Sequence, residues 1–490
     1  MIFGTDVSPT RPGTALRTFV RIGGLATLVI LAFLLGQQST QRAQIESDDL
    51  SSPNAPLTDV PRQVLPQDLQ PFIQLLSPLE TDVRRALSKI EADWVDAYAI
   101  MLVEMIRFVK QQGMRQECLA VLTRATGQNF AFDVNRWLDW IWQREPGRHP
   151  DYAQFKAALY QMIDPRFREY FENRPSATIR LDEIRWGGVV RDGIPPLKTP
   201  KMIAATEATY LDDSHIVFGI EVNGDARAYP KRILAWHEMF KDTIGGESVN
   251  GVYCTLCGSM IVYRTVVDGV HHELGTSGFL YRSNKLMYDH ATKSLWSTLA
   301  GKPVVGSLVG KGIELEVLYA VTTTWGQWRK RHPHTEVLSL DTGFKRDYGE
   351  GVAYREYFSH DRLMFTVPQL DHRLKNKAEV LALRFSHLSD QPLAISTTFL
   401  AQNPIYHGKA GTVTFVVLTD PSGAHRVYET RGLRFVAWDG QRQVTDEHEN
   451  TWALDEEAMI KQGQRLGRLP AHRAFWFGWF AVYPQTRLVQ

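Results

Sequence analysis

Two of the three cysteines in this 490-residue chain lie three positions apart, as Cys254 and Cys257, and a glycine follows them directly. Thiolates at this spacing form half of a zinc or iron site, or a dithiol that cycles to a disulfide. The same turn could instead hold a structural disulfide or two inert thiols. Cys118 lies far away in a helical stretch, so the chain cannot supply a four-cysteine metal site.

Histidine would therefore have to complete a metal site. His237, seventeen residues before Cys254, is the leading candidate. Cys254, Cys257 and His237 as ligands would leave one position open, the arrangement of catalytic metal centres, and Glu238 could then act as a general base. The metal would be zinc, or copper(I) if a methionine thioether joined the ligands. Further candidate ligands are His271, His272, His290, Met260 and Met287.

Two other functions remain open at this point. One is an extracytoplasmic thiol–disulfide redox module, and the other is a non-catalytic binding scaffold whose cysteines are locked as a disulfide. Whether the protein is an enzyme stays undecided. The 55 Lys and Arg residues balance 54 Asp and Glu residues, so the composition gives no basic field for nucleic acid. No nucleotide cofactor is expected.

The N-terminus predicts the location of the protein. Arg11, Arg17 and Arg21 precede an apolar, uncharged run at 22–36. This pattern predicts a signal anchor over residues 1–36, with a cleaved signal peptide as the alternative. The arginines place the N-terminus in the cytoplasm. We therefore expect a single-pass protein of the bacterial inner membrane, with most of the chain periplasmic or extracellular and a polar linker at 37–62.

A helical domain is predicted over residues 63–172. Apolar residues recur every three to four positions up to Gly113, and Asp133 is expected to cap a tryptophan-rich helix. The stretch TGQNFAFDVNRWLDW resembles the end of HEAT-like helical units, which implies a surface that could bind a protein partner.

Strand-like runs replace this pattern from about residue 180. They include IVFGIEV, VNGVYC and MIVYRTVVDGVHHEL, the last with a hairpin signal at Asp268-Gly269. A helix is expected at 322–333, ended by Pro333. Strands at this density predict a mainly β domain over 180–350.

An internal repeat suggests a second copy of this domain over residues 375–490. His271 matches His425 at an offset of 154 residues, and W-x-x-W recurs at Trp325 and Trp476. Two units, roughly 210–341 and 378–490, follow from this alignment, and their tryptophans are expected to fill cores. The second unit has no cysteine and is expected to run as continuous strand where the first has C-x-x-C-G. A fold that forms without cysteines does not need them, which favours a chemical role.

The first β unit resembles the bacterial family called domain of unknown function 3179. The resemblance rests on WHEMFKDTIGG, YCTLCGSMIVY, TSGFLYRSNKLMYDHATKSLWS and RHPHT, in this order. It implies an envelope-facing β domain with a shared Cys/His constellation, and no particular activity. It also implies positions near the cysteines, namely Ser277, Tyr281, Ser283, Met287, Asp289 and Trp296. The expected fold class is α+β, with an anchor, a small HEAT-like helical domain and two tandem β domains.

Overall fold

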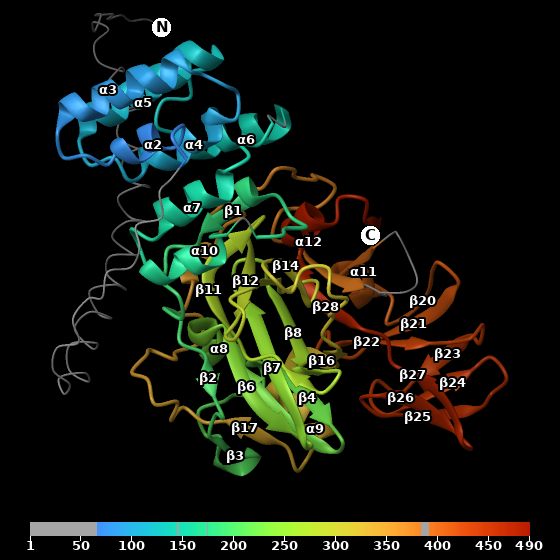
Figure 1. Cartoon of the computed structure of the whole chain (residues 1–490). Coiled ribbons are helices and arrows are strands. Elements are labelled where there is room, and N and C mark those ends of the chain that lie inside the picture. The colour runs from blue at the N-terminus through green and yellow to red at the C-terminus, as the bar shows by residue number, and fades with distance from the viewer. Residues whose placement is uncertain (1–65, 145–146, 174, 384–391) are drawn as a thin grey trace, which may run out of the picture. The chain divides into compact units, whose positions relative to one another are not determined.

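The computed structural model describes residues 66–144, 147–173, 175–383 and 392–490, which belong to one compact unit of the chain (Figure 1). The predicted anchor and linker lie outside the described residues. Within the described part, none of the helices combines the length and apolarity that crossing a membrane would require. The architecture is α+β, as predicted, with helices first and several sheets after them.

The helical region packs short helices around one apolar core. They are α2 (Gln70–Gln74), α3 (Glu80–Ala92), α4 (Tyr98–Ile106), α5 (Gln112–Thr126), α6 (Val134–Arg144), α7 (Tyr152–Tyr160) and the 3-10 helix η1 (Pro165–Tyr170). Asp133 caps α6 as predicted, because its Oδ1 accepts the Arg136 N–H at 3.0 Å. The predicted stop at Gly113 is wrong, since this glycine lies in the first turn of α5. The apolar residues keep their spacing of three to four positions across the gaps between these helices, because consecutive helices pack into one core.

The core of the helical region continues into the first sheet. Phe279 and Leu286 of that sheet belong to the same apolar cluster as the helices. Lys156 of α7 is fully buried, pairs with Glu104 at 2.8 Å and donates to the Ile184 carbonyl oxygen at 2.9 Å. A buried ion pair needs good geometry and further hydrogen bonds, which this lysine has.

The first β half contains three five-stranded sheets. The first sheet has the order β16 (Ala320–Thr324), β4 (Ile216–Val222), β5 (Asp225–Pro230), β17 (Glu336–Leu338) and β3 (Met202–Ala204). The second sheet has the order β15 (Val317–Leu318), β8 (Ser259–Arg264), β7 (Glu247–Cys254), β6 (Met239–Ile244) and β2 (Leu197–Lys198). The third sheet has the order β1 (Ile184–Trp186), β11 (Leu274–Tyr281), β12 (Asn284–Asp289), β13 (Leu295–Ser297) and β14 (Lys302–Val305). The predicted hairpin at Asp268-Gly269 is present between β9 (Val266–Val267) and β10 (Val270–His271). Helix α8 (Lys231–His237) follows β5, and α9 (Trp325–Arg331) follows β16.

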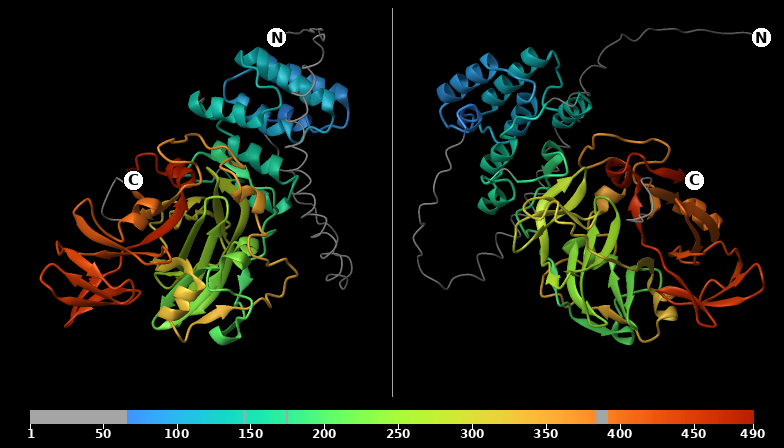
Figure 2. Two further views of the ribbon diagram at one scale, coloured as in Figure 1. Left: turned by 180° about the vertical axis from the view of Figure 1, so that it is seen from behind. Right: turned by 45° about the vertical axis from the view of Figure 1, so that its right-hand side comes forward.

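The second half has three sheets, of four, three and five strands. Their orders are β28 (Ala471–Phe475), β18 (Glu379–Leu383), β19 (Leu393–Ser396), β29 (Arg487–Val489); β20 (Ile405–Ala410), β21 (Val413–Thr419), β22 (His425–Glu429); and β23 (Phe435–Trp438), β24 (Gln443–Asp446), β25 (Thr451–Leu454), β26 (Ala458–Lys461), β27 (Gln464–Gly467). Figure 2 shows these orange and red strands beside the green and yellow strands of the first half. Three helices, α10 (Arg355–Phe358), α11 (Thr397–Gln402) and α12 (Trp476–Val482), complete the chain.

The first sheet of each half has the same order of strands. β16-β4-β5-β17 corresponds to β28-β18-β19-β29, and in both sheets only the last pair is parallel. A helix follows the same strands in each half, α8 and α9 in the first, α11 and α12 in the second. The paired tryptophans of α9 and α12 are almost fully buried, as predicted.

The residue pairs that predicted the repeat are not the pairs that correspond in this strand order. The offset of 154 pairs His271 with His425, yet His271 lies on the exposed strand β10 and His425 begins β22. By strand order β22 corresponds to β8, so the C-x-x-C turn corresponds to the turn at 420–424 between β21 and β22. The expected replacement of this turn by continuous strand is therefore wrong. Short motifs aligned at a constant offset cannot register the different loop lengths of the two halves.

Candidate functional site

The two cysteines lie in the tight turn of a β-hairpin. Cys254 is the last residue of β7 and pairs with Ser259, the first residue of β8. Gly258 closes the turn with a φ of +63°, a conformation that glycine adopts without strain. Both cysteines are reduced in the structure, and their exposed fractions are 2% and 1%.

The two sulfurs have different electrostatic surroundings. Burial by itself would raise the pKa of Cys254, but the neighbouring Cys257 side chain and the Lys285 and Cys257 N–H groups favour the thiolate, so that the pKa is lowered. The Cys257 thiol lies 3.9 Å from the Cys254 carbonyl oxygen. Burial and the neighbouring Cys254 side chain raise the pKa of Cys257 well above its ordinary value. The Cys257 sulfur also lies 3.2 Å from Ser259 Oγ. The two pKa directions thus favour a thiolate at Cys254 and a thiol at Cys257.

Glu238 reaches this turn from the end of helix α8. It has a left-handed backbone with a φ of +55°, uncommon for a residue other than glycine, and its N–H caps the helix at Leu234 O. Its Oε1 accepts the hydroxyl of Thr255, the residue after Cys254, at 2.7 Å. Its carbonyl oxygen accepts the Tyr253 N–H at 2.9 Å. The predicted site residue Glu238 therefore does lie against the C-x-x-C turn.

A buried lysine balances the charge of Glu238. Lys285 of β12 donates to Glu238 Oε2 at 2.8 Å, and both side chains are less than 10% exposed. Tyr354 donates to Glu238 Oε1 at 3.0 Å, and burial, followed by the Glu238 charge, raises the pKa of this tyrosine well above its ordinary value. Neither Lys285 nor Tyr354 was predicted from the sequence as a site residue. Lys285 lies within a quoted family motif, and its position in a buried strand run was the available signal.

The segment between β17 and β18 covers the cysteines. Tyr357 donates to the Leu256 carbonyl oxygen at 2.7 Å, inside the C-x-x-C turn. Its ring also belongs to the apolar cluster that contains both cysteines. Lys377 lies 3.4 Å from the centre of the Tyr357 ring and donates to the His360 carbonyl oxygen at 2.6 Å. The thiols are thus closed off by a segment that carries only one short helix.

The second β half also contacts the turn. The Phe475 N–H donates to the Cys257 carbonyl oxygen at 2.7 Å. A Cβ atom added at Gly478 of α12 would lie 2.6 Å from Cys257 Cβ, and Asn284 donates to the Gly478 carbonyl oxygen at 2.9 Å. Only glycine at 478 permits this close approach. The cysteine-free half therefore forms part of the surroundings of the cysteines.

His237 faces away from the cysteines. Its Nδ1 donates to the Pro195 carbonyl oxygen at 2.9 Å, and its Nε2 therefore accepts the Tyr348 hydroxyl at 2.6 Å. Burial lowers the pKa of His237 to about 4, which keeps the ring neutral. Both ring nitrogens are occupied, so the structure does not bring His237 together with Cys254 and Cys257 as metal ligands.

The other predicted ligands have other partners as well. His272 lies 3.3 Å from Asp289, His271 3.3 Å from Ser248, and His290 3.5 Å from Lys241 Nζ. Ser277 donates to the Leu286 carbonyl oxygen, Ser283 to that of Phe365, and Met287 Sδ accepts Asn250 Nδ2 at 3.8 Å. Tyr281 and Trp296 pack in the cores between sheets. None of these contacts is with a cysteine, and they are explained by strand packing.

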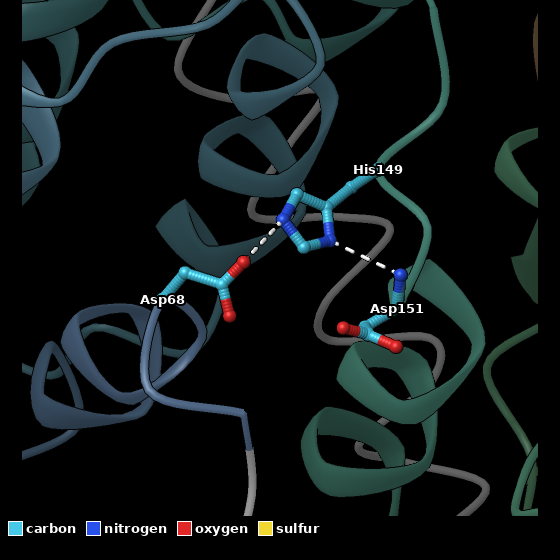
Figure 3. A group of neighbouring side chains, drawn as sticks. All are labelled: Asp68, His149 and Asp151. Atoms are coloured by element: carbon cyan, nitrogen blue, oxygen red, sulfur yellow. Dashed lines mark hydrogen bonds and ion pairs between the residues drawn. The ribbon is translucent and has the colours of Figure 1, made fainter.

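Within the described residues, one group of side chains has the geometry to hold a metal ion, namely Asp68, His149 and Asp151 (Figure 3). His149 Nδ1 accepts the Asp151 N–H at 3.2 Å, so its Nε2 carries the proton that is shared with Asp68 at 2.9 Å. Both ring nitrogens of His149 therefore already have partners within the protein. These bonds explain the group as a tie between the start of the helical region and helix α7.

Comparison with known proteins gives a family but no function. A family described as "Protein of unknown function (DUF3179)" matches residues 191–486, more than half of the chain. This range contains Glu238, Cys254, Lys285 and Tyr354, and it continues from the first β unit into the second β half, which was predicted to be a degenerate copy of the first. Searches of curated proteins and of solved structures found no match. The chain therefore belongs to the DUF3179 family.

Proposed function

We propose that Cys254 and Cys257 form a thiol–disulfide redox site. The observation that carries this proposal is the placement of two buried cysteines, without a disulfide between them, in one tight turn, with the pKa of Cys254 lowered and that of Cys257 raised. A nucleophilic thiolate beside a protonated resolving thiol is the arrangement that disulfide exchange requires. The neighbouring Glu238–Lys285 pair fixes the turn through Thr255.

The reaction is exchange with an external disulfide, RS–SR. The Cys254 thiolate attacks one sulfur, forms a mixed disulfide and releases RS⁻. The Cys257 thiol then loses its proton to the released thiolate and attacks Cys254 Sγ, which releases the second RS⁻. The products are a Cys254–Cys257 disulfide, one thiol and one thiolate, so the protein loses two electrons and one proton. Since both cysteines are almost fully buried, the covering segment must move before the disulfide can approach.

The proposal also covers the cell compartment of the protein and the origin of its two β halves. A protein anchored by residues 1–36 with its bulk outside the cytoplasm would work where disulfides persist, and the arginines before the apolar run 22–36 support this location. The two β halves are proposed to be copies of one ancestral unit. The shared strand order and the equivalent helices α9 and α12 support that origin.

The test is equilibration of the full chain in glutathione redox buffers, followed by trapping of free thiols and mass analysis. We expect an intramolecular disulfide in the wild-type chain and in Cys118→Ser, the matched control, but not in Cys254→Ser or Cys257→Ser. Failure of the wild-type chain to form this disulfide under any oxidising ratio, including in the presence of a small disulfide at low denaturant, would refute the proposal.

The alternative is a metal site that uses the same thiols. It requires bound zinc or copper in protein purified without chelators, and loss of that metal in Cys254→Ser. The positions of His237 and its partners give this alternative no support, since its ring nitrogens are both occupied. Stoichiometric metal that disappears in Cys254→Ser would replace the redox proposal.

A further inference from the structure

A cavity of about 710 Å³, wide open to the surface, lies beside helix α8. Arg232 of α8 lines it together with residues from 340–349, the loop that follows β17. Its volume falls in the range of small-molecule sites, roughly 300–1,000 Å³. Nothing in the redox chemistry uses this cavity.

Hydrogen bonds to α8 hold the loop in place. The Trp236 indole N–H donates to the Asp347 carbonyl oxygen at 2.8 Å, and the Arg232 guanidinium donates to the carbonyl oxygens of Tyr348 and Tyr210. The Tyr348 hydroxyl donates to His237. The cavity wall is therefore preformed, which lowers the entropic cost of binding a ligand.

The charge of the cavity is positive. Lys345 and Arg346 contribute two cations, and neither lies within ion-pairing distance of a carboxylate among the residues that the structure describes. Arg232 lies 3.9 Å from Glu350, a weak pairing. The one carboxylate in the lining, Asp347, accepts the Gly349 N–H at 2.8 Å, inside its own turn. Two uncompensated cations at a cavity favour an anionic ligand.

Apolar side chains flank these cations. Phe344 and Leu340 are 39% and 40% exposed, which is unusual for large apolar residues in a loop with an ordered wall. The Phe344 ring packs on His237, with 5.1 Å between ring centroids. A ring held on one side and open on the other can stack on a flat ligand.

We propose that this cavity binds a small organic anion in which a carboxylate or sulfonate is joined to a flat apolar group. Lys345 and Arg346 bind the charge, and Phe344 packs on the flat part. Arg232 precedes Glu238 by six residues, so these two residues lie about 9 Å apart along the axis of α8. The proposal does not depend on the redox chemistry.

The test is calorimetric titration of the full chain with naphthalene-2-sulfonate, the neutral 2-naphthalenemethanol and inorganic sulfate. We expect the sulfonate to bind at least tenfold more tightly than either of the others, and more weakly as salt is raised. Lys345→Gln with Arg346→Gln should weaken sulfonate binding at least tenfold, and Phe344→Ala should weaken it severalfold.

The control is Lys311→Gln with Lys330→Gln, which removes two exposed cations elsewhere on the same β half. This double variant should bind the sulfonate as the wild-type chain does. The inference is overturned if the wild-type chain does not bind the sulfonate, if sulfate alone binds as tightly, or if both double variants lose affinity equally.

Discussion

Gly478 offers a direct test of whether helix α12 closes the dithiol site. A Cβ atom at 478 would lie 2.6 Å from Cys257 Cβ and 3.3 Å from Cys257 Cα, both of which belong to a buried turn. Gly478→Ala must therefore push α12 and the C-x-x-C turn apart by about 1 Å to restore ordinary contact distances, and overpacking of this kind costs about 1–3 kcal/mol.

Alanine also favours a helix over glycine, by about 1 kcal/mol, so the bare effect of Gly478→Ala mixes two terms. Gly113→Ala is the matched control, because Gly113 also lies in a helix and a Cβ there would meet nothing within 4 Å. We expect Gly113→Ala to be neutral or stabilising, and Gly478→Ala to be less stable than this control by about 1–3 kcal/mol.

The assay is urea unfolding of both variants, combined with the rate at which a thiol reagent labels the native protein. The displaced helix should also make the thiols of Gly478→Ala react faster than those of the wild-type chain. Equal unfolding free energies for the two variants, with unchanged thiol reactivity, would show that α12 does not press on Cys257 and would refute the reasoning.

Three further predictions concern the site. Lys285→Met leaves Glu238 as a buried charge without its cation and should destabilise the protein by about 3–5 kcal/mol. The double variant Lys285→Met with Glu238→Gln should recover part of this loss. Equal denaturation midpoints for the single and double variants would contradict the pairing. The pKa of His237 is lowered to about 4 in the folded protein, so the unfolded chain binds more protons than the folded one between about pH 4 and 6.5. The free energy of unfolding should therefore fall as the pH falls through this window. Unfolding measured at each pH should show a fall up to about 3 kcal/mol larger in the wild-type chain than in His237→Gln. Cys257→Ala removes the side chain that lowers the pKa of Cys254 and should raise the pKa seen in the pH profile of Cys254 alkylation; an unchanged profile would argue against the influence of Cys257 on Cys254.

The sequence was sufficient for features that depend on local pattern. The Asp133 cap, the Asp268-Gly269 hairpin and the buried tryptophans of α9 each rest on a few neighbouring residues and were predicted correctly. The C-x-x-C turn and the proximity of Glu238 to it were predicted too, the first from spacing and the second from a neighbour. Family membership followed from motifs in the right order.

Tertiary structure decided which distant residues meet. Glu238 and His237 are adjacent in the chain, yet the left-handed backbone at Glu238 ends α8 and turns its side chain to the cysteines while His237 points to Tyr348. Lys285 and Gly478 reach the same turn from β12 and α12, across sheets that no sequence period connects. Local pattern fixes secondary structure and burial, because these depend on neighbours along the chain. The composition of a site depends on strand order and on the direction in which each element ends, and these are set by packing between elements far apart in sequence.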